Sequence, residues 1–254
     1  MRIDDGATTG WIRRFHDATG STARLVCFPY AGGSASFFHP VSARFSPGTD
    51  VVALQYPGRQ DRRREACVED IGKLADQLAD ALAGLSAKPA VFFGHSMGAV
   101  LAFETAYRLE RAGTNAPAAV VASGRRAPST RRDERVHERD DQGLIAELRL
   151  LDGTDSAVFG HEELLQLALP AIRGDYTAIE TYRCEPGRRI AAPIAVLTGE
   201  DDPKTTRPEA EAWREHTSGA FTLRVFPGGH FFLADHQADV DTELAGHLDA
   251  LRVS

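Results

Sequence analysis

One pentapeptide in the middle of the chain constrains the fold more than any other feature. The sequence Gly-His-Ser-Met-Gly at residues 94–98 follows four apolar residues and precedes an apolar run. A G-x-S-x-G sequence in that context is typical of a nucleophile elbow, a sharp turn between a strand and a helix. The turn strains the serine backbone, and its glycines let strand and helix approach closely. Because such a pentapeptide also arises by chance, the rest of the chain decides whether Ser96 is a nucleophile.

Short apolar segments alternate with amphipathic segments along the chain. Strands are expected at residues 24–30, 51–56, 90–93, 118–123, 194–198 and 221–226. Helical spacing or capping predicts helices at residues 37–45, 68–85, 98–112, 208–216 and 237–252. This alternation predicts an α/β fold, with a mostly parallel central sheet and helices on both faces. Functional groups then belong at the carboxyl ends of the strands.

The alternation of strands and helices is interrupted after residue 124. Residues 125–141 are almost entirely polar, and the leucines and isoleucines within residues 142–182 have helical spacing. The gap before the next strand is longer than a crossover helix requires. We therefore expect a single domain over residues 1–254 that carries a helical lid insertion at about residues 125–188.

Composition and charge exclude several classes of function. The net charge of −7 argues against a nucleic-acid-binding protein. The polar N-terminus is not a signal peptide, and no apolar run is long enough to span a membrane. Cys27, Cys67 and Cys184 lie far apart, which predicts reduced thiols, with Cys27 as a buried apolar residue. We expect a cytoplasmic monomer that binds neither nucleic acid nor membrane.

A nucleophilic serine needs a base to remove its proton and an acid to orient that base. In sheets of this type the order along the chain is serine, acid, histidine. His230 is the one histidine after Ser96 that lies in a turn following an apolar strand, and neighbouring glycines let that turn fold back. It is therefore the predicted base. His95 adjoins Ser96 on the turn and points in another direction, so we expect it to have a supporting role.

Three carboxylates compete for the role of the acid. Glu200, Asp201 and Asp202 all follow the strand that precedes the predicted base. The G-x-x-D spacing from Gly199 favours Asp202, while Asp201 is the main rival and Glu200 is less favoured. An adjacent aspartate pair also suggests a metal, but no histidine or further carboxylate is clustered nearby in the sequence. We expect neither a metal nor a cofactor.

Acyl transfer to a serine produces an oxyanion, which backbone N–H groups must stabilise. One donor is expected to be Met97, directly after the serine. The other is expected from the loop after the first strand, where Ala31, give or take one residue, is favoured.

Several further segments occur together and in order. They resemble the type II thioesterases of polyketide and nonribosomal peptide synthesis over nearly the whole chain. The segments are residues 28–35 (FPYAGGSA), 55–59 (QYPGR), 94–98 (GHSMG), 169–176 (LPAIRGDY), 180–182 (ETY), 199–202 (GEDD) and 228–232 (GGHFF), with Trp11 ahead of them. Gly174, where the family often has alanine, is a departure that affects no catalytic position.

The resemblance implies an α/β-hydrolase that cleaves acyl groups from the phosphopantetheine arm of acyl or peptidyl carrier proteins. Its expected role is to remove stalled or aberrant acyl chains from synthases. Ser96 would attack the thioester carbonyl while His230 takes the proton and Asp202 steadies the imidazolium. The amides of Met97 and Ala31 would hold the oxyanion, and water would then release the acyl group.

Arginines near the second expected strand are candidates for recognition of this substrate. Arg59, Arg62, Arg63 and Arg64 could complement the phosphate of the arm and an acidic carrier protein. Solvated surface ion pairs explain them equally well. The same two interpretations apply to the arginines in residues 125–135, which have acidic neighbours.

Three other functions are compatible with parts of the sequence. A carboxylesterase would hydrolyse oxygen esters without regard to a carrier protein. An acyltransferase would replace water by another nucleophile, and a non-catalytic docking protein would not need the serine, aspartate and histidine. The chain could also be a domain cut from a synthase, but the start at Met1 without an upstream carrier segment favours a free-standing protein.

Overall fold

A seven-stranded sheet runs through the centre of the molecule. The computed structural model describes residues 10–152 and 162–253. Strand order is β1-β3-β2-β4-β5-β6-β7, and every neighbouring pair is parallel except the antiparallel pair β1 and β3. The strands are β1 (Ile12–Arg13), β2 (Arg24–Phe28), β3 (Asp50–Leu54), β4 (Ala90–His95), β5 (Ala119–Ser123), β6 (Ile194–Gly199) and β7 (Phe221–Phe226). The predicted α/β class with a mostly parallel sheet is confirmed.

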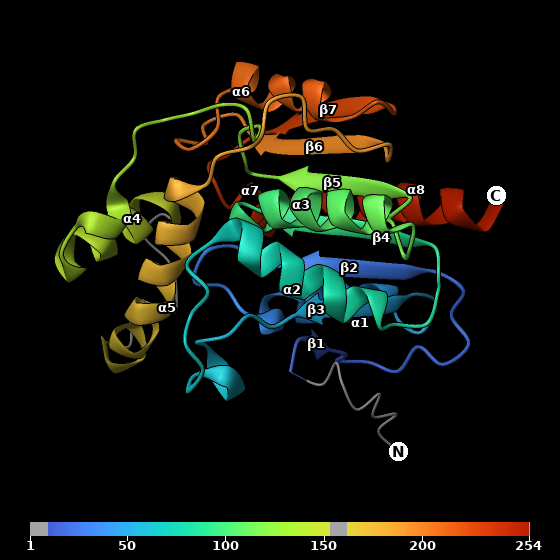
Figure 1. Cartoon of the computed structure of the whole chain (residues 1–254), viewed down its shortest axis with the longest axis horizontal. Helices are drawn as coiled ribbons and strands as arrows, with labels where there is room; N and C mark the ends of the chain where they lie inside the picture. The colour runs from blue at the N-terminus through green and yellow to red at the C-terminus, as the bar shows by residue number, and fades with distance from the viewer. Residues whose placement is uncertain (1–9, 153–161, 254) are drawn as a thin grey trace.

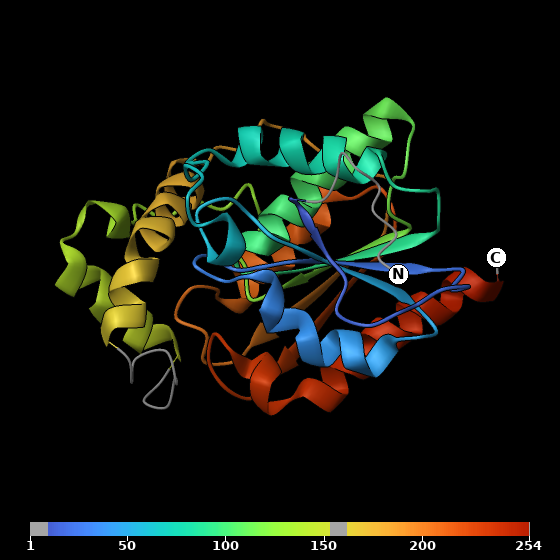
Figure 2. The same ribbon diagram turned by 90° about the horizontal axis from the view of Figure 1, so that it is seen from below.

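Helices cover both faces of the sheet. Figure 2 shows α2 and α3 on one face and α1 and α8 on the other. The α-helices are α1 (His39–Phe45), α2 (Ile71–Ala83), α3 (Met97–Ala112), α4 (Asp141–Asp152), α5 (Glu162–Thr181), α6 (Arg207–Glu211), α7 (Phe232–Asp235) and α8 (Gln237–Val253). None of these helices has the length and apolar character that crossing a bilayer would require.

The two cores of the sheet follow from the alternation of side chains along its strands. In β2, Val26 and Phe28 pack in the core beneath α2 and α3, whereas Leu25 and Cys27 pack in the core beneath α8. Successive side chains of a strand point to opposite faces, so a central strand buried on both faces is apolar throughout. Burial also raises the pKa of the Cys27 thiol, and this cysteine is a buried apolar residue as predicted.

Two local features differ from the expectation. The helix expected over residues 37–45 begins with a 3₁₀ turn, Ala35–Phe38, and α1 starts only at His39. Pro40 has no N–H to donate to the carbonyl four residues earlier, so helical hydrogen bonding restarts there. The edge strand β1 was not expected. It contains only two residues, which pair with Ala53 and Leu54 of β3, and so short a strand has no periodic pattern to read.

The segment between β5 and β6 forms a separate layer. In Figure 1, α4 and α5 lie beyond the carboxyl ends of the parallel strands. They pack around a hydrophobic cluster of their own, which includes Val136, Leu144, Leu169 and Tyr176. Residues 153–161 of the expected insertion lie outside the described residues. The described helices stand over the edge of the sheet at which β4 ends.

The turn from β4 into α3 is closed by two glycines. A Cβ atom on Gly94 would lie 2.1 Å from the carbonyl oxygen of Gly98, and one on Gly98 would lie 2.0 Å from the carbonyl oxygen of Phe28. Between them, Ser96 has φ 53° and ψ −119°. Side chains rarely tolerate a positive φ, so the backbone at Ser96 is strained, as the pentapeptide predicts.

Gly98→Ala is expected to destabilise the protein by about 2–3 kcal/mol or more, because its methyl group would overlap the β2 backbone. Gly246→Ala on α8 is the matched control, since a Cβ atom there meets nothing within 4 Å. Alanine has the higher helix propensity, so this control should be neutral or gain up to about 1 kcal/mol. Urea denaturation measures both, and equal stabilities of the two variants would contradict the close-contact argument.

Candidate active site

A small cavity lies between the carboxyl edge of the sheet and the α4–α5 layer. It encloses about 350 Å³ of empty space, which includes some that is open to solvent. The sheet side contributes Ala31, Ser96, Met97 and His230, and the insertion contributes Leu151, Tyr176, Ile179 and Glu180. The structure thus brings four of the five predicted site residues, which come from three separate loops, to one cavity. The fifth, Asp202, lies against His230.

His230 and Asp202 form a buried pair. Nδ1 of His230 lies 3.0 Å from each carboxylate oxygen of Asp202, and the two side chains are 2% and 0% exposed. Asp202 Oδ1 also accepts the backbone N–H of Lys204 at 2.8 Å. The rival carboxylates Glu200 and Asp201 are exposed. A proton on Nδ1 donates to Asp202, which leaves Nε2 of His230 available as a base.

His95 buttresses the His230 loop. It is completely buried, and its Nδ1 atom lies 3.0 Å from the Ser123 hydroxyl. The ring centroid is 5.1 Å from that of His230 and 5.1 Å from that of Phe231. Burial, and then the nearby His230, lower the pKa of His95 well below its usual value. A neutral aromatic ring therefore packs behind His230, where a second cation would be unfavourable.

The loop after β2 offers one amide to the cavity. Gly32 donates its N–H to Asp175 Oδ2 at 2.7 Å, and Gly33 donates to the Tyr30 carbonyl at 2.8 Å. Within the described residues no hydrogen bond engages the Ala31 N–H. Met97 on the opposite side is the first residue of α3, where helix amides lack internal acceptors and the helix dipole is positive. The amides of Ala31 and Met97 thus belong to cavity-lining residues on two different loops.

A buried ion pair supports that loop, and the sequence did not reveal it. Arg59 Nη1 and Nη2 donate to the two carboxylate oxygens of Asp175 at 2.7 and 2.8 Å. Nη1 also donates to the Gly33 carbonyl at 3.0 Å. The side chains of Arg59 and Asp175 are only 7% and 2% exposed. Asp175 on α5 therefore bonds both the cation and the Gly32 amide beside Ala31.

The interpretation of Arg59 and Arg62 as surface recognition residues is wrong. Arg59 is buried against Asp175, and Arg62 lies over the Trp11 ring, 4.2 Å from its centroid, while pairing with Glu65. Both guanidinium groups are buried and pair with carboxylates of the same chain. Asp175 is 116 residues from Arg59 in the sequence, so no local pattern could indicate this partner. Of the four arginines, only Arg63 and Arg64 are exposed.

The polar segment after β5 contributes charged groups to the cavity. Arg126 and Lys204 both pair with Glu134. Burial raises the pKa of Glu134, but the two cations outweigh that effect and lower it to about 2. Arg125 lines the same cavity, and in the described part of the chain no carboxylate pairs with it. Among the described residues, no cluster of histidine, cysteine and acidic side chains could hold a metal ion.

Known proteins share this architecture. A family model described as "Thioesterase domain" matches residues 23–251. The chain belongs to the thioesterase domain family. A solved relative, the type II thioesterase BorB from the borrelidin biosynthetic cluster, is 53% identical and has a TM-score of 0.89, with 94% of this chain and 97% of that chain covered. The protein is accordingly a thioester hydrolase of the α/β-hydrolase fold.

Two curated relatives of this thioesterase come from Streptomyces. A probable cadicidin biosynthesis thioesterase of Streptomyces griseus is 63% identical over 241 residues, which are 95% of this chain and 66% of that protein. Thioesterase PikA5 of Streptomyces venezuelae is 45% identical over 249 residues, which are 98% of this chain and 88% of that protein. The chain therefore spans about two thirds of the first relative and most of the second.

Removing the carboxylate of the buried pair should destabilise the thioesterase strongly. Asp175→Ala leaves the Arg59 charge buried without a partner, which typically costs about 3–5 kcal/mol. Glu211→Ala removes the exposed partner of Arg207 and should cost less than about 1 kcal/mol. Chemical denaturation of both variants measures the difference.

A double variant separates the charge effect from lost packing. Arg59→Met combined with Asp175→Leu replaces both charges by apolar side chains and should recover much of the stability lost in Asp175→Ala. A double variant no more stable than Asp175→Ala would show that the unpaired charge is not the cause.

Proposed function

We propose that this thioesterase hydrolyses acyl groups from the phosphopantetheine arm of acyl or peptidyl carrier proteins. Its role is to edit polyketide or nonribosomal peptide synthases by removing stalled or aberrant chains. The observation that carries the proposal is the buried His230–Asp202 pair beside the cavity at Ser96. The relatives named for cadicidin biosynthesis and the borrelidin biosynthetic cluster support the choice of substrate.

In the first half-reaction, Ser96 Oγ attacks the thioester carbonyl carbon while His230 Nε2 takes the hydroxyl proton. Asp202 stabilises the imidazolium that forms and holds the ring in position. The amides of Met97 and Ala31 donate to the oxyanion. Ala31 is favoured over Gly32 because the Gly32 N–H already donates to Asp175. Each such donor is worth about 3–4 kcal/mol in the transition state.

Collapse of the tetrahedral intermediate expels the pantetheine sulfur. A thiol of this kind has a pKa near ~8.5, so the thiolate leaves more readily than an amine, and His230 returns the proton to it. Water then attacks the acyl-serine carbonyl and gives its proton to His230. The second tetrahedral intermediate releases the carboxylic acid and regenerates the Ser96 hydroxyl.

The cavity supports small acyl groups as substrates. Charged residues, among them Arg125, Glu134 and Lys204, form part of its wall. A long alkyl chain would have to desolvate these groups without compensating them. We assign the α4–α5 segment, within the insertion at residues 125–188 of a single domain, the role of a lid over this cavity.

The proposed enzyme works as a monomer in the cytoplasm, where its partner is a carrier protein. The three free cysteines support a reducing compartment. Cys27 is buried, and Cys67 and Cys184 are half-buried.

Ser96→Ala should reduce hydrolysis of an acetyl-loaded carrier protein by at least about a thousandfold, because the acyl-enzyme cannot form. Ser218→Ala is the matched control, as it changes an exposed serine near β7. The measurement is the rate of acetate release from the acetyl-loaded carrier protein, compared with the rate from an oxygen ester of acetic acid. Equal rates for Ser96→Ala and the control would refute the mechanism. A preference for the oxygen ester would favour a carboxylesterase.

The two adjacent aspartates provide a direct test of the acid. Asp202→Asn should lower kcat about ten-thousandfold, because the amide stabilises the wrong histidine tautomer and no imidazolium. Asp201→Asn changes an exposed neighbour and should leave kcat within about twofold of wild type. A larger loss from Asp201→Asn would overturn the assignment of the acid.

A further inference from the structure

Arg125 is a buried cation that has no carboxylate partner within residues 10–152 and 162–253. Its exposure is 8%, and its enclosed Nε atom has no hydrogen-bond partner among the described residues. Burial, together with the neighbouring Arg126, lowers the pKa of the Arg125 guanidinium to about 9, so the group is still charged at neutral pH. Burying an unpaired charge is costly. A ligand that brings a negative charge would compensate for that cost.

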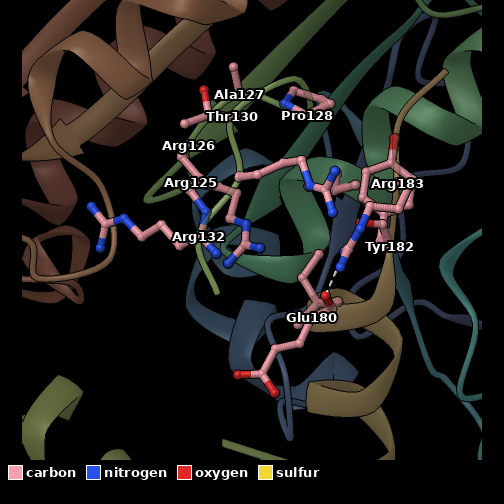
Figure 3. A pocket seen from close by; sticks show the side chains of 12 residues that line it. Arg125, Arg126, Ala127, Pro128, Thr130, Arg132, Glu180, Tyr182 and Arg183 are labelled. Atoms are coloured by element: carbon pink, nitrogen blue, oxygen red, sulfur yellow. Dashed lines mark hydrogen bonds between the residues drawn. The ribbon is translucent and has the colours of Figure 1, made fainter. Parts of the chain in front are cut away.

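A second pocket adjoins the catalytic cavity at this arginine. Figure 3 shows it between the loop that follows β5 and the C-terminal end of α5. It encloses about 370 Å³ of empty space, which includes some that is open to solvent. The pocket and the catalytic cavity share three lining residues, Arg125, Ile179 and Glu180. We call this second pocket the outer pocket. A ligand bound in it lies next to the cavity that contains Ser96.

Five arginines line the outer pocket, and two of them are neutralised. Arg126 pairs with Glu134, and Arg132 pairs with Glu209. The carboxylate of Glu180, at the boundary with the catalytic cavity, accepts backbone N–H groups from Val136 and His137 at 3.0 Å each, and the His137 ring as well.

The other three arginines lack a carboxylate. Within the described residues, exposed Arg131 makes neither an ion pair nor a hydrogen bond, and Arg183 donates to the backbone oxygens of Glu180 and Tyr182. Arg125 is the third of these cations. Together they place positive charge both at the solvent side of the pocket and at its junction with the catalytic cavity.

We propose that the outer pocket binds the phosphate group of the pantetheine arm, with Arg125, Arg131 and Arg183 as its cationic ligands. This inference rests on the proposed function. Guanidinium groups match phosphate oxygens in geometry and charge. The phosphate is at the opposite end of the arm from the thioester, so it must lie outside the cavity that contains Ser96. The outer pocket meets this requirement, since it adjoins that cavity and is lined by two exposed arginines, Arg131 and Arg183.

Two small substrates that differ only in the phosphate test this site. They are acetyl-S-pantetheine and acetyl-S-4′-phosphopantetheine, and the readout is the ratio of their kcat/KM values. Wild type should prefer the phosphorylated substrate by about tenfold or more, the contribution expected of charge-assisted hydrogen bonds. Arg131→Ala combined with Arg183→Ala should bring the ratio to within twofold of one, because kcat/KM falls far more for the phosphorylated substrate than for acetyl-S-pantetheine. Arg207→Ala, which removes an exposed arginine of α6, should retain the wild-type ratio.

Arg125→Gln should also lower the preference for phosphate, and the exposed pair decides the matter if this buried variant does not fold. An unchanged ratio in the Arg131/Arg183 double variant, or an equal loss on both substrates, would overturn the proposal. The ratio of kcat/KM values for malonyl-S-pantetheine and acetyl-S-pantetheine tests whether the arginines instead bind a carboxylate on the acyl group. If only that ratio responds to the arginines, they bind an acyl carboxylate and the phosphate assignment is wrong.

The failure of this inference is distinguishable from the failure of the proposed function. The function fails if wild type does not hydrolyse an acyl-loaded carrier protein in a Ser96-dependent manner, and the phosphate site fails with it. The phosphate site alone fails if that hydrolysis occurs and the preference for the phosphorylated substrate is independent of these arginines.

Discussion

The buried ion pair between Arg59 and Asp175 joins three segments that are distant in the sequence. It connects the loop after β3, the loop after β2 and helix α5 of the insertion. Through Gly32, the same aspartate holds the backbone beside Ala31. A fully paired charge of this kind contributes little net stability but penalises every arrangement that separates its partners. The position of the loop after β2 and the packing of α5 against it therefore depend on the same aspartate.

The buried arginines of this acidic protein fall into two groups, which differ in whether a carboxylate pairs with them. Arg59 and Arg62 have carboxylate partners and hydrogen bonds inside the protein, and they serve the fold. Arg125 is equally buried but has no carboxylate partner in the part of the chain that the structure describes, and it lies where the Ser96 cavity meets a pocket rich in arginine. Net charge does not reveal this contrast, because −7 for the whole chain coexists with a local excess of positive charge. What matters for binding is which guanidinium groups the fold leaves without a partner.

Local patterns predicted the central elements of the fold and proposed the residues of the candidate site. A strand, a sharp turn and a helix around Ser96 follow from apolar runs and two glycines, and the structure shows how closely the backbones approach at Gly98. His230 and Asp202 were selected because each follows a strand whose carboxyl end must reach the same edge of the sheet, and they lie 3.0 Å apart. Such patterns do not predict contacts between residues that are far apart in the sequence. The partner of Arg59 and the two-residue strand β1 belong to this group.

The sequence by itself determined the alternation of strands and helices, the edge of the sheet where chemistry can occur, and the residues that can take part in it. These features depend on periodicity, glycine positions and chain order, all of which are local properties. Only the tertiary structure decided which arginines are buried in ion pairs, and that the amide of cavity-lining Ala31 has no acceptor among the described residues. It also decided that Asp202 rather than Asp201 faces His230. The reason is physical, because hydrogen bonding and charge compensation depend on neighbours in space, and folding brings those neighbours from anywhere in the chain.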